Sequence, residues 1–163
     1  MSGYTDASFQ TDKDDFWSQS GFIFCLNGGA MSWKSSKKST VADSTTEAEY
    51  IAASKAAKEA VWIRNFIAEL GVVPSISGPV DLYCDNNGAI AQAKESRSHQ
   101  KSKHILWQYH LIRDIVDRGD VKISRVSTDA NVADPLTKLL QRPKHESHTT
   151  VVEIKYLKMW SWF

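Results

Sequence analysis

The stretch "LYCDNNGAIAQAKE", residues 82–95, joins an apolar run to an acid, two amides and a glycine, and then to an alanine-rich segment. The run ending at Cys84 is typical of a buried strand, and residues 88–94 are typical of a short helix. Asp85 therefore follows the end of a strand, at the sheet edge where open α/β folds bind ligands. An Asp before Asn-Asn-Gly would equally serve as a helix cap, so Asp85 alone does not decide the function.

The composition predicts one globular domain without a membrane segment. The chain has 163 residues, of which 42% are hydrophobic, and a formal net charge of +1. A chain of this length buries roughly two thirds of its unfolded surface, and no apolar run approaches the length of about 20 residues that spans a bilayer. The N-terminus lacks a signal-peptide pattern, and Cys25 and Cys84 lie in apolar runs, so we expect a cytoplasmic protein with free thiols. Any attraction to nucleic acid must come from local basic patches.

Around residues 82–95 the chain changes from short strands to alternating strands and helices. The predicted strands are 3–7, 20–26, 30–35, 80–84 and 121–126, and the predicted helices are 45–70, 88–94 and 104–118, with a further helix start at Asp134. The turn Asn27-Gly28-Gly29 predicts a hairpin of the second and third strands. Ser44 to Glu47 is a capping box, and Gly71 ends the long helix. This order predicts an α/β fold in which helices pack against a mixed sheet.

Helix geometry separates the two glutamates near the start of the long helix. Glu49 shares an apolar stripe with Ala53, Ala56, Ala60, Ile63, Ile67 and Leu70. Glu47 falls with Ser54, Lys55, Lys58 and Asn65, so we expect it on the solvated side. A carboxylate on the apolar stripe is costly unless it is paired or binds a metal, and no Lys or Arg shares the stripe. A Glu hydrogen-bonded at the helix start remains the alternative.

Two further acids lie in or beside predicted elements. Asp6 is on the first strand, where alternation would equally turn it to solvent, and Asp134 precedes a proline in an arrangement typical of a helix N-cap. Together with Glu49 and Asp85, these two make four acids at element ends. Four such acids can converge to hold two divalent ions, which clamp the attacking and leaving oxygens in phosphoryl transfer. Oxygen ligands suit Mg²⁺ or Mn²⁺ better than zinc.

Several motifs in fixed order resemble the ribonuclease H domain of copia-type LTR retrotransposon Pol polyproteins. They are residues 20–64, "LYCDNNGAIAQAK", "KSKHI" with "YHLIRD", and "NVADPLTK", and the resemblance covers about residues 3–145. It implies a ribonuclease H-like fold with a five-stranded mixed sheet, three antiparallel strands being followed by parallel strands. It also implies hydrolysis of the RNA strand of RNA–DNA hybrids, with Asp6, Glu49, Asp85 and Asp134 as the catalytic acids that bind two Mg²⁺ or Mn²⁺ ions.

The resemblance also implies a context for the chain. In that family the domain follows the reverse transcriptase at the end of the polyprotein, so the reverse transcriptase is an expected partner and cytoplasmic virus-like particles the expected location. Residues 1–145 would form the ribonuclease H domain, and residues 146–163 a tail that matches the family poorly. The segment Ser127–Asn131 lacks the histidine that cellular and retroviral relatives usually carry before the last acid.

Basic and amide side chains are candidates for contacts with an RNA–DNA hybrid. The stretches "WKSSKK" and "ESRSHQKSKH" contribute Lys34, Lys37, Lys38, Arg97, Lys101 and Lys103 as candidate phosphate contacts, although basic loops are commonly only solvated. Asn86 and Asn87 would contact ribose 2′-hydroxyls, although they equally suit a tight turn.

Three other functions agree with part of the pattern. They are a decayed, catalytically weak module that binds nucleic acid or supports a reverse transcriptase, an integrase-like polynucleotidyl transferase, and a phosphatase acting on small molecules. The presence of all four acids argues against decay. The long helix bearing Glu49 and the motif "NVADPLTK" favour ribonuclease H over an integrase.

Overall fold

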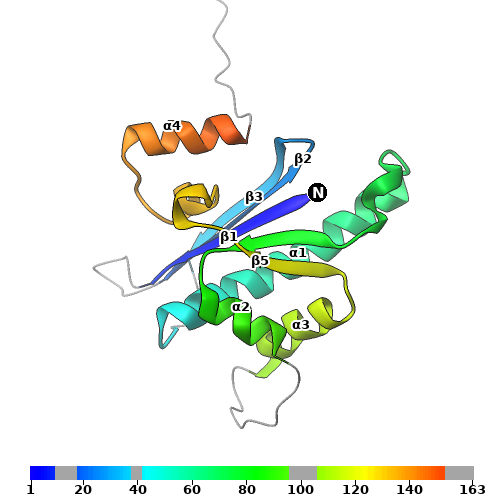
Figure 1. The fold of residues 1–163 in the computed structure, drawn as a ribbon, viewed down its shortest axis with the longest axis horizontal. Coiled ribbons are helices and arrows are strands. Elements are labelled where there is room, and N and C mark those ends of the chain that lie inside the picture. The colour runs from blue at the N-terminus through cyan, green and yellow to red at the C-terminus, as the bar shows by residue number, and fades with distance from the viewer. Residues whose placement is uncertain (10–17, 38–41, 96–105, 153–163) are drawn as a thin grey trace, which may run out of the picture.

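A five-stranded mixed sheet forms the centre of the computed structural model, which describes residues 1–9, 18–37, 42–95 and 106–152 (Figure 1). The strands are β1 (Ser2–Ser8), β2 (Gln19–Leu26), β3 (Gly29–Lys37), β4 (Val80–Cys84) and β5 (Val121–Arg125). Their order across the sheet is β3-β2-β1-β4-β5. Strand β1 pairs antiparallel with β2 and parallel with β4, while β2–β3 is antiparallel and β4–β5 parallel. The predicted mixed sheet is therefore confirmed.

The β2–β3 hairpin turns at Asn27 and Gly28, which both have positive φ angles of 52° and 88°. Two central residues with positive φ match the right-handed twist of the flanking strands, which is why Asn-Gly is favoured in such turns. Gly29 belongs to β3, where it pairs with Leu26. The sequence signal therefore placed the hairpin correctly, although β3 extends beyond the predicted strand 30–35 by Gly29 at its start and by Ser36 and Lys37 at its end.

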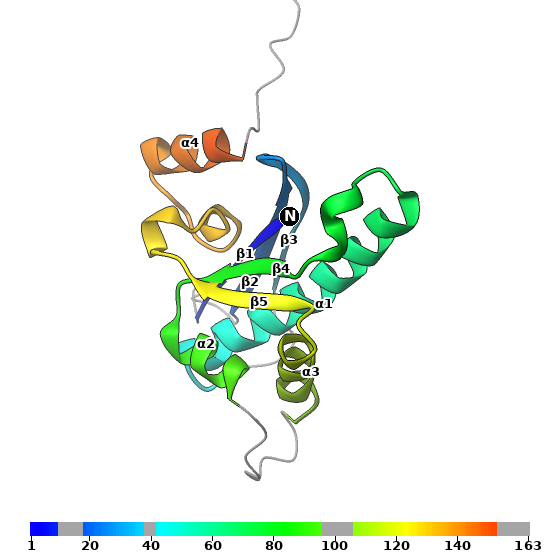
Figure 2. The same ribbon diagram turned by 45° about the vertical axis from the view of Figure 1, so that its right-hand side comes forward.

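Helices cover both faces of the sheet (Figure 2). Helices α1 (Thr45–Leu70), α2 (Asn87–Lys94) and α3 (Leu106–Asp117) lie on one face, and α4 (Arg142–Val151) lies beyond the other. The main core, which includes Phe24, Leu82 and Ile112, fills the space between the sheet and the first three helices. A smaller cluster of Ile23, Cys25, Val132, Ala133 and Val152 forms on the α4 side, where Ala30 N donates to the Val152 carbonyl at 3.1 Å.

Helix α1 packs closely on the sheet because its inner stripe is built from alanine. Ala53, Ala56 and Ala60 are each 0% exposed, as the stripe predicts. The prediction of a solvated Glu47 is wrong, since Glu47 is 8% exposed and Ser54 beside it is buried. A second cluster, which includes Ala48, Ile51 and Ala52, buries another side of the same helical turns.

The C-terminal end of α1 is more exposed than the apolar stripe predicts. Leu70, predicted to be buried, is 55% exposed, because the last turns of α1 extend past the sheet (Figure 2). The helix ends at Gly71, whose φ of 66° allows its N–H to bond to the Ala68 carbonyl. The short 3₁₀ helix η1 (Pro74–Ser77) then leads to β4.

The segment after β5 differs from the helix start predicted at Asp134. It forms two short 3₁₀ helices, η2 (Thr128–Ala130) and η3 (Asp134–Leu136), and the Asp134 side chain makes no capping bond. The chain leaves helical geometry at Thr137, whose φ is −127°. Helix α4 then runs across residue 145, so residues 146–151 are helical.

Two further observations concern the environment of the chain. Both Cys25 and Cys84 are buried free thiols, as predicted. Within the described ranges, no helix is long and apolar enough to cross a membrane.

Candidate metal centre

The parallel pairing of β1 and β4 brings Asp6 and Asp85 to the same edge of the sheet, because both strands end there. Asp134 reaches this edge from η3, which packs against β1 and β2. Carboxylate oxygens of these three aspartates all lie within 4.8 Å of one another. Asp6 and Asp134 are 0% and 1% exposed, and Asp85 is half-buried. The three aspartates therefore form a nearly buried cluster of oxygen ligands.

Glu49 joins this cluster from the second turn of α1. Its Oε1 accepts a hydrogen bond from Ala7 N at 3.0 Å, directly beside Asp6 in the chain. Ligand atoms of Glu49, Cys84 and Asp85 also lie within 4.8 Å of one another, so Asp85 belongs to both groups. The Cys84 thiol lies 4.0 Å from Glu49 Oε2. The structure thus brings together all four acids that the sequence singled out.

Burial and mutual repulsion change the acidity of this cluster. Burial, followed by the charges of Asp6 and Asp85, raises the pKa of Glu49 to about 8. Burial also raises the pKa of Asp6, against the opposing effects of Thr137 and Lys138. The Cys84 thiol has a pKa raised to about 12 by burial and by Glu49, so it is a neutral neighbour of the carboxylates. A cation at this position would offset the cost of ionising several buried acids.

Two lysines near the C-terminal end supply positive charge that the sequence prediction missed. Lys138 Nζ lies 3.1 Å from Asp6 Oδ1 and 2.8 Å from Asp134 Oδ1. Lys144 Nζ, from α4, lies 3.2 Å from Asp134 Oδ2 and 3.2 Å from Asp129 Oδ1. Burial lowers the pKa of Lys138, but its bonds to Asp134 and Asp6 outweigh burial and hold that pKa above its usual range. The spacing of Asp134 and Lys138, four residues apart, was the available sequence signal.

Neutral residues fix the segment that carries Asp134. The Thr137 hydroxyl donates a hydrogen bond to Asp6 Oδ2. Asn131, which is 0% exposed, donates from Nδ2 to the Thr5 carbonyl at 3.0 Å and accepts from Ala133 N. On β2, a Cβ added at Gly21 would lie 2.7 Å from Leu136 Cβ, so only glycine allows η3 to approach this closely.

The structure describes four of the predicted substrate-contacting residues. Asn86 is half-buried and caps α2 by accepting from Ala89 N at 3.0 Å, whereas Asn87 is the exposed first residue of that helix. Lys34 and Lys37 are exposed on the edge strand β3. Burial and then the charge of Lys34 lower the pKa of Lys55 on α1. Lys55 is thus a basic neighbour of Lys34 that was not among the predicted phosphate contacts. Lys38, Arg97, Lys101 and Lys103 lie outside the described residues.

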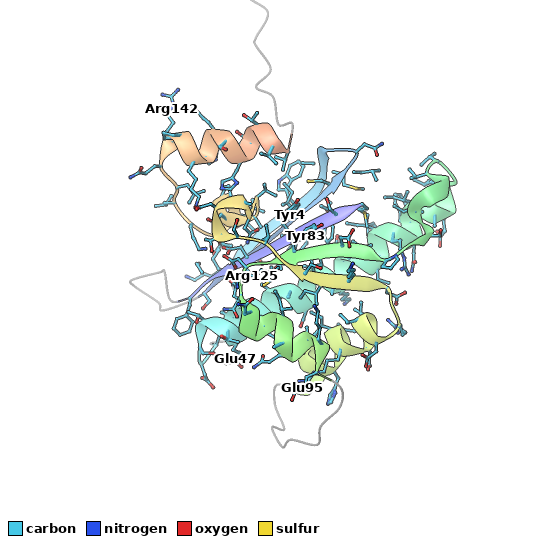
Figure 3. All side chains as sticks on the ribbon, viewed as in Figure 1. Tyr4, Glu47, Tyr83, Glu95, Arg125 and Arg142 are labelled. Atoms are coloured by element: carbon cyan, nitrogen blue, oxygen red, sulfur yellow. The ribbon has the colours of Figure 1, made fainter. Side chains whose placement is uncertain are left out.

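The surroundings of this sheet edge are partly aromatic and partly basic. Figure 3 shows Tyr4 and Tyr83 side by side on β1 and β4, with ring centroids 5.1 Å apart. Arg125, the exposed last residue of β5, pairs in register with Cys84 and so lies at the same end of the sheet (Figure 3). A negatively charged ligand approaching the carboxylates would therefore meet Arg125 nearby.

The donor set fits hard divalent cations. All four acids offer carboxylate oxygens, the ligand type that Mg²⁺ and Mn²⁺ prefer. The ammonium of Lys138, held by two of these carboxylates, shows directly that the cluster accommodates positive charge.

The fold is that of ribonuclease H. LC11-RNase H1, solved in complex with an RNA/DNA hybrid, superimposes with a TM-score of 0.59 at 16% identity, covering 83% of this chain and 92% of that chain. The foamy viral protease-reverse transcriptase, also solved with an RNA/DNA hybrid, gives a TM-score of 0.60 at 18% identity over 83% of this chain and 19% of that chain. At these identities the likeness establishes the fold.

Sequence comparison identifies the chain as a homologue of one segment of retrovirus-related Pol polyproteins from plant transposons. It is 44% identical over 146 residues to the Pol polyprotein of transposon TNT 1-94 from Nicotiana tabacum, covering 90% of this chain and 11% of that protein. It is 36% identical over 154 residues to the polyprotein of transposon RE1 from Arabidopsis thaliana, covering 94% and 10%. The chain therefore spans about a tenth of the length of these relatives. No family model matches it.

Proposed function

We propose that this chain is an endonuclease that hydrolyses the RNA strand of RNA–DNA hybrids during retrotransposon reverse transcription. Asp6, Glu49, Asp85 and Asp134 would hold two divalent ions, Mg²⁺ or Mn²⁺. The observation that carries this proposal is the convergence of four acids from separate segments at one sheet edge. The ribonuclease H fold and the Pol polyprotein homologues support the same activity.

The protein side chains have distinct parts in this proposal. Bound divalent ions would activate a water nucleophile and stabilise the charge that develops on the phosphate. Glu49, with a pKa of about 8, must lose its proton to become a ligand. The hydrogen bond from Ala7 N would keep the Glu49 carboxylate next to Asp6, where it could bind an ion. Asp85, which lies in both acid groups, connects the two halves of the site.

Substrate contacts would surround this centre. Asn87 is exposed beside Asp85 and can approach a ribose 2′-hydroxyl, whereas Asn86 has its side-chain oxygen engaged by Ala89 N. Lys34 and Lys37 can contact phosphates from β3, and Lys38, Arg97, Lys101 and Lys103 are proposed for the same role.

The proposed context is a polyprotein. Relatives carry this segment within proteins about ten times its length, and the foamy viral structure joins a reverse transcriptase to a region of the same fold. We propose that residues 1–145 form the catalytic domain, that the reverse transcriptase of the same polyprotein is its partner, and that both act in cytoplasmic virus-like particles.

The decisive experiment compares substrates and one matched pair of variants. Labelled RNA–DNA hybrid, double-stranded RNA and double-stranded DNA are incubated with the protein and Mg²⁺, and the products are resolved by length. We expect cleavage of the RNA strand of the hybrid only, lost in Asp85→Asn and retained in Asp117→Asn, which removes an exposed acid of α3. Hybrid binding without cleavage would favour the decayed module, and cleavage of DNA duplexes would favour an integrase-like enzyme.

A further inference from the structure

The ammonium of Lys138 lies between two of the proposed metal ligands. Its Nζ contacts Asp6 Oδ1 at 3.1 Å and Asp134 Oδ1 at 2.8 Å, although these acids come from opposite ends of the chain. Both aspartate side chains are almost completely buried, whereas the Lys138 side chain is 35% exposed. The lysine therefore inserts its charge into the cluster from the solvent side.

We propose that Lys138 is an internal counter-ion of the acidic cluster, and that a divalent ion binds Asp6 and Asp134 by displacing its ammonium. The inference rests on the proposed metal site and adds a residue that controls its occupancy. Lys138 would hold the acids together before metal binding and would raise the metal concentration at which the site fills.

Displacement follows from the geometry of the contacts. Mg²⁺ approaches its oxygen ligands to about 2.0–2.1 Å, with a nearly octahedral arrangement. A divalent ion held by Asp6 and Asp134 would compete with Nζ for the carboxylates that the ammonium already contacts, and like charges this close in a buried site repel strongly. A lysine has a flexible four-carbon stem, so the ammonium of Lys138 can leave towards solvent without movement of the backbone.

Lys144 provides a contrast on the same aspartate. It contacts Asp134 through the other oxygen, Oδ2, and shares its charge with Asp129, whose side chain is 94% exposed. It has no contact with Asp6 among the described residues. Lys144 therefore does not occupy the Asp134 oxygen that Lys138 contacts, and its loss would change the charge near the cluster without freeing that oxygen.

The test measures metal affinity directly. Isothermal titration calorimetry with Mg²⁺ and with Mn²⁺, at constant ionic strength, compares the unaltered protein with Lys138→Met, Lys144→Met and Asp85→Asn. We expect Lys138→Met to lower the dissociation constant by about tenfold, equivalent to about 1.4 kcal/mol. Lys144→Met should change it by less than about threefold, and Asp85→Asn should abolish binding. In EDTA, Lys138→Met should melt at a lower temperature than the unaltered protein, because two buried acids lose their counter-ion.

The outcomes separate this inference from the proposed function. Equal or weaker metal binding by Lys138→Met, with binding still lost in Asp85→Asn, would overturn the counter-ion role and leave the metal site standing. A similar gain in Lys138→Met and Lys144→Met would also overturn it, since general charge would then explain the effect. No binding by any variant would overturn both. If Lys138→Met does not fold, Lys138→Gln, whose uncharged amide can still donate hydrogen bonds, replaces it in the same titrations.

Discussion

The side-chain nitrogen of Asn131 donates a hydrogen bond to the backbone carbonyl of Thr5 at 3.0 Å, joining residues 126 positions apart. Both residues are completely buried. Thr5 precedes Asp6 on β1, and Asn131 lies three residues before Asp134, whose backbone N–H bonds to the Asn131 carbonyl. This amide side chain therefore links the two segments that carry Asp6 and Asp134.

Asn131→Ala should destabilise the protein by about 2–3 kcal/mol, because the Thr5 carbonyl and the Ala133 N–H lose a buried partner. Urea unfolding measures this change. Hybrid cleavage should fall as well, since η3 loses its anchor to β1. Asn65→Ala, at an exposed position of α1, is the control and should change stability by less than about 0.5 kcal/mol. Equal stability of both variants would mean that the anchor is unimportant.

Gly21→Ala should move η3 away from β2. The added Cβ would lie 2.7 Å from Leu136 Cβ and 3.0 Å from Thr137 Cγ2, closer than side chains tolerate. We expect a loss of stability of about 1–3 kcal/mol and weaker Mg²⁺ binding, because Asp134 moves with η3. Gly78→Ala is the matched control, since its Cβ would meet no atom within 4 Å and its φ is −74°. Unchanged metal affinity in Gly21→Ala would show that Asp134 does not depend on this contact.

Glu49→Gln should abolish hybrid cleavage, whereas Glu47→Gln should leave it nearly normal. Both side chains are buried on α1, but only Glu49 joins the acid cluster. Glu47 instead accepts a hydrogen bond from Asp43 N at 2.6 Å, a contact that the Gln oxygen can also make. Cleavage rates of the two variants, measured with the same hybrid, check this prediction. The reverse order of activities would exclude Glu49 from the site.

Mg²⁺ should raise the melting temperature of the protein. A ligand that binds only the folded state at about 100 times its dissociation constant adds about 2.7 kcal/mol of stability, or several degrees for a domain of this size. Asp85→Asn should melt slightly higher in EDTA, because it removes one of several mutually repelling charges, and should lose its response to Mg²⁺. Thermal melts of both proteins across a Mg²⁺ titration test this. Identical melts under every condition would mean that the acids share no metal.

In EDTA, the stability of the protein should fall as pH rises from about 5 to about 8. The pKa of Glu49 is raised from 4.5 to about 8 by folding, so the folded state binds this proton more tightly than the unfolded chain. Stability from this group is complete below its unfolded pKa and is lost as pH rises towards the folded value. Urea unfolding at a series of pH values should show a shallower decline in Glu49→Gln. An identical decline in both proteins would assign the effect to another group.

Local signals account for the parts of the fold that the sequence predicted best. The bounds of α1 and β4 agree with the prediction at Thr45, Leu70, Val80 and Cys84, because a capping serine, Gly71 and a short apolar run mark them within a few residues. The position of Asp85 after β4 follows from the same run. The Asp-Pro pair favours a helix start at Asp134, whereas the structure has only the short 3₁₀ helix η3 there, packed closely against Gly21.

Long-range contacts account for what the sequence could not predict. The Asp6–Lys138 ion pair joins residues 132 positions apart, and no local sequence pattern near either residue predicts it. The single apolar stripe through Glu49 predicts an exposed Glu47. In the structure, however, the cluster containing Ile51 and Ala52 buries a second face of α1. The positions of the four acids at element ends indicate their convergence, and the i,i+4 spacing indicates the Asp134–Lys138 pair, but the contact of Lys138 with Asp6 depends on the tertiary fold.

The parallel pairing of β1 with β4 also has a consequence for biosynthesis. Residues 2–4 pair with residues 81–83 of β4, so this ladder cannot form until residue 83 has been synthesised. Contacts of such sequence separation form slowly compared with hairpins and helices. The β1–β2–β3 meander and α1 can assemble first, bringing Asp6 and Glu49 together without Asp85 or Asp134. A growing chain therefore acquires its complete set of carboxylates only in the last steps of folding, and translation products truncated before η3 lack it.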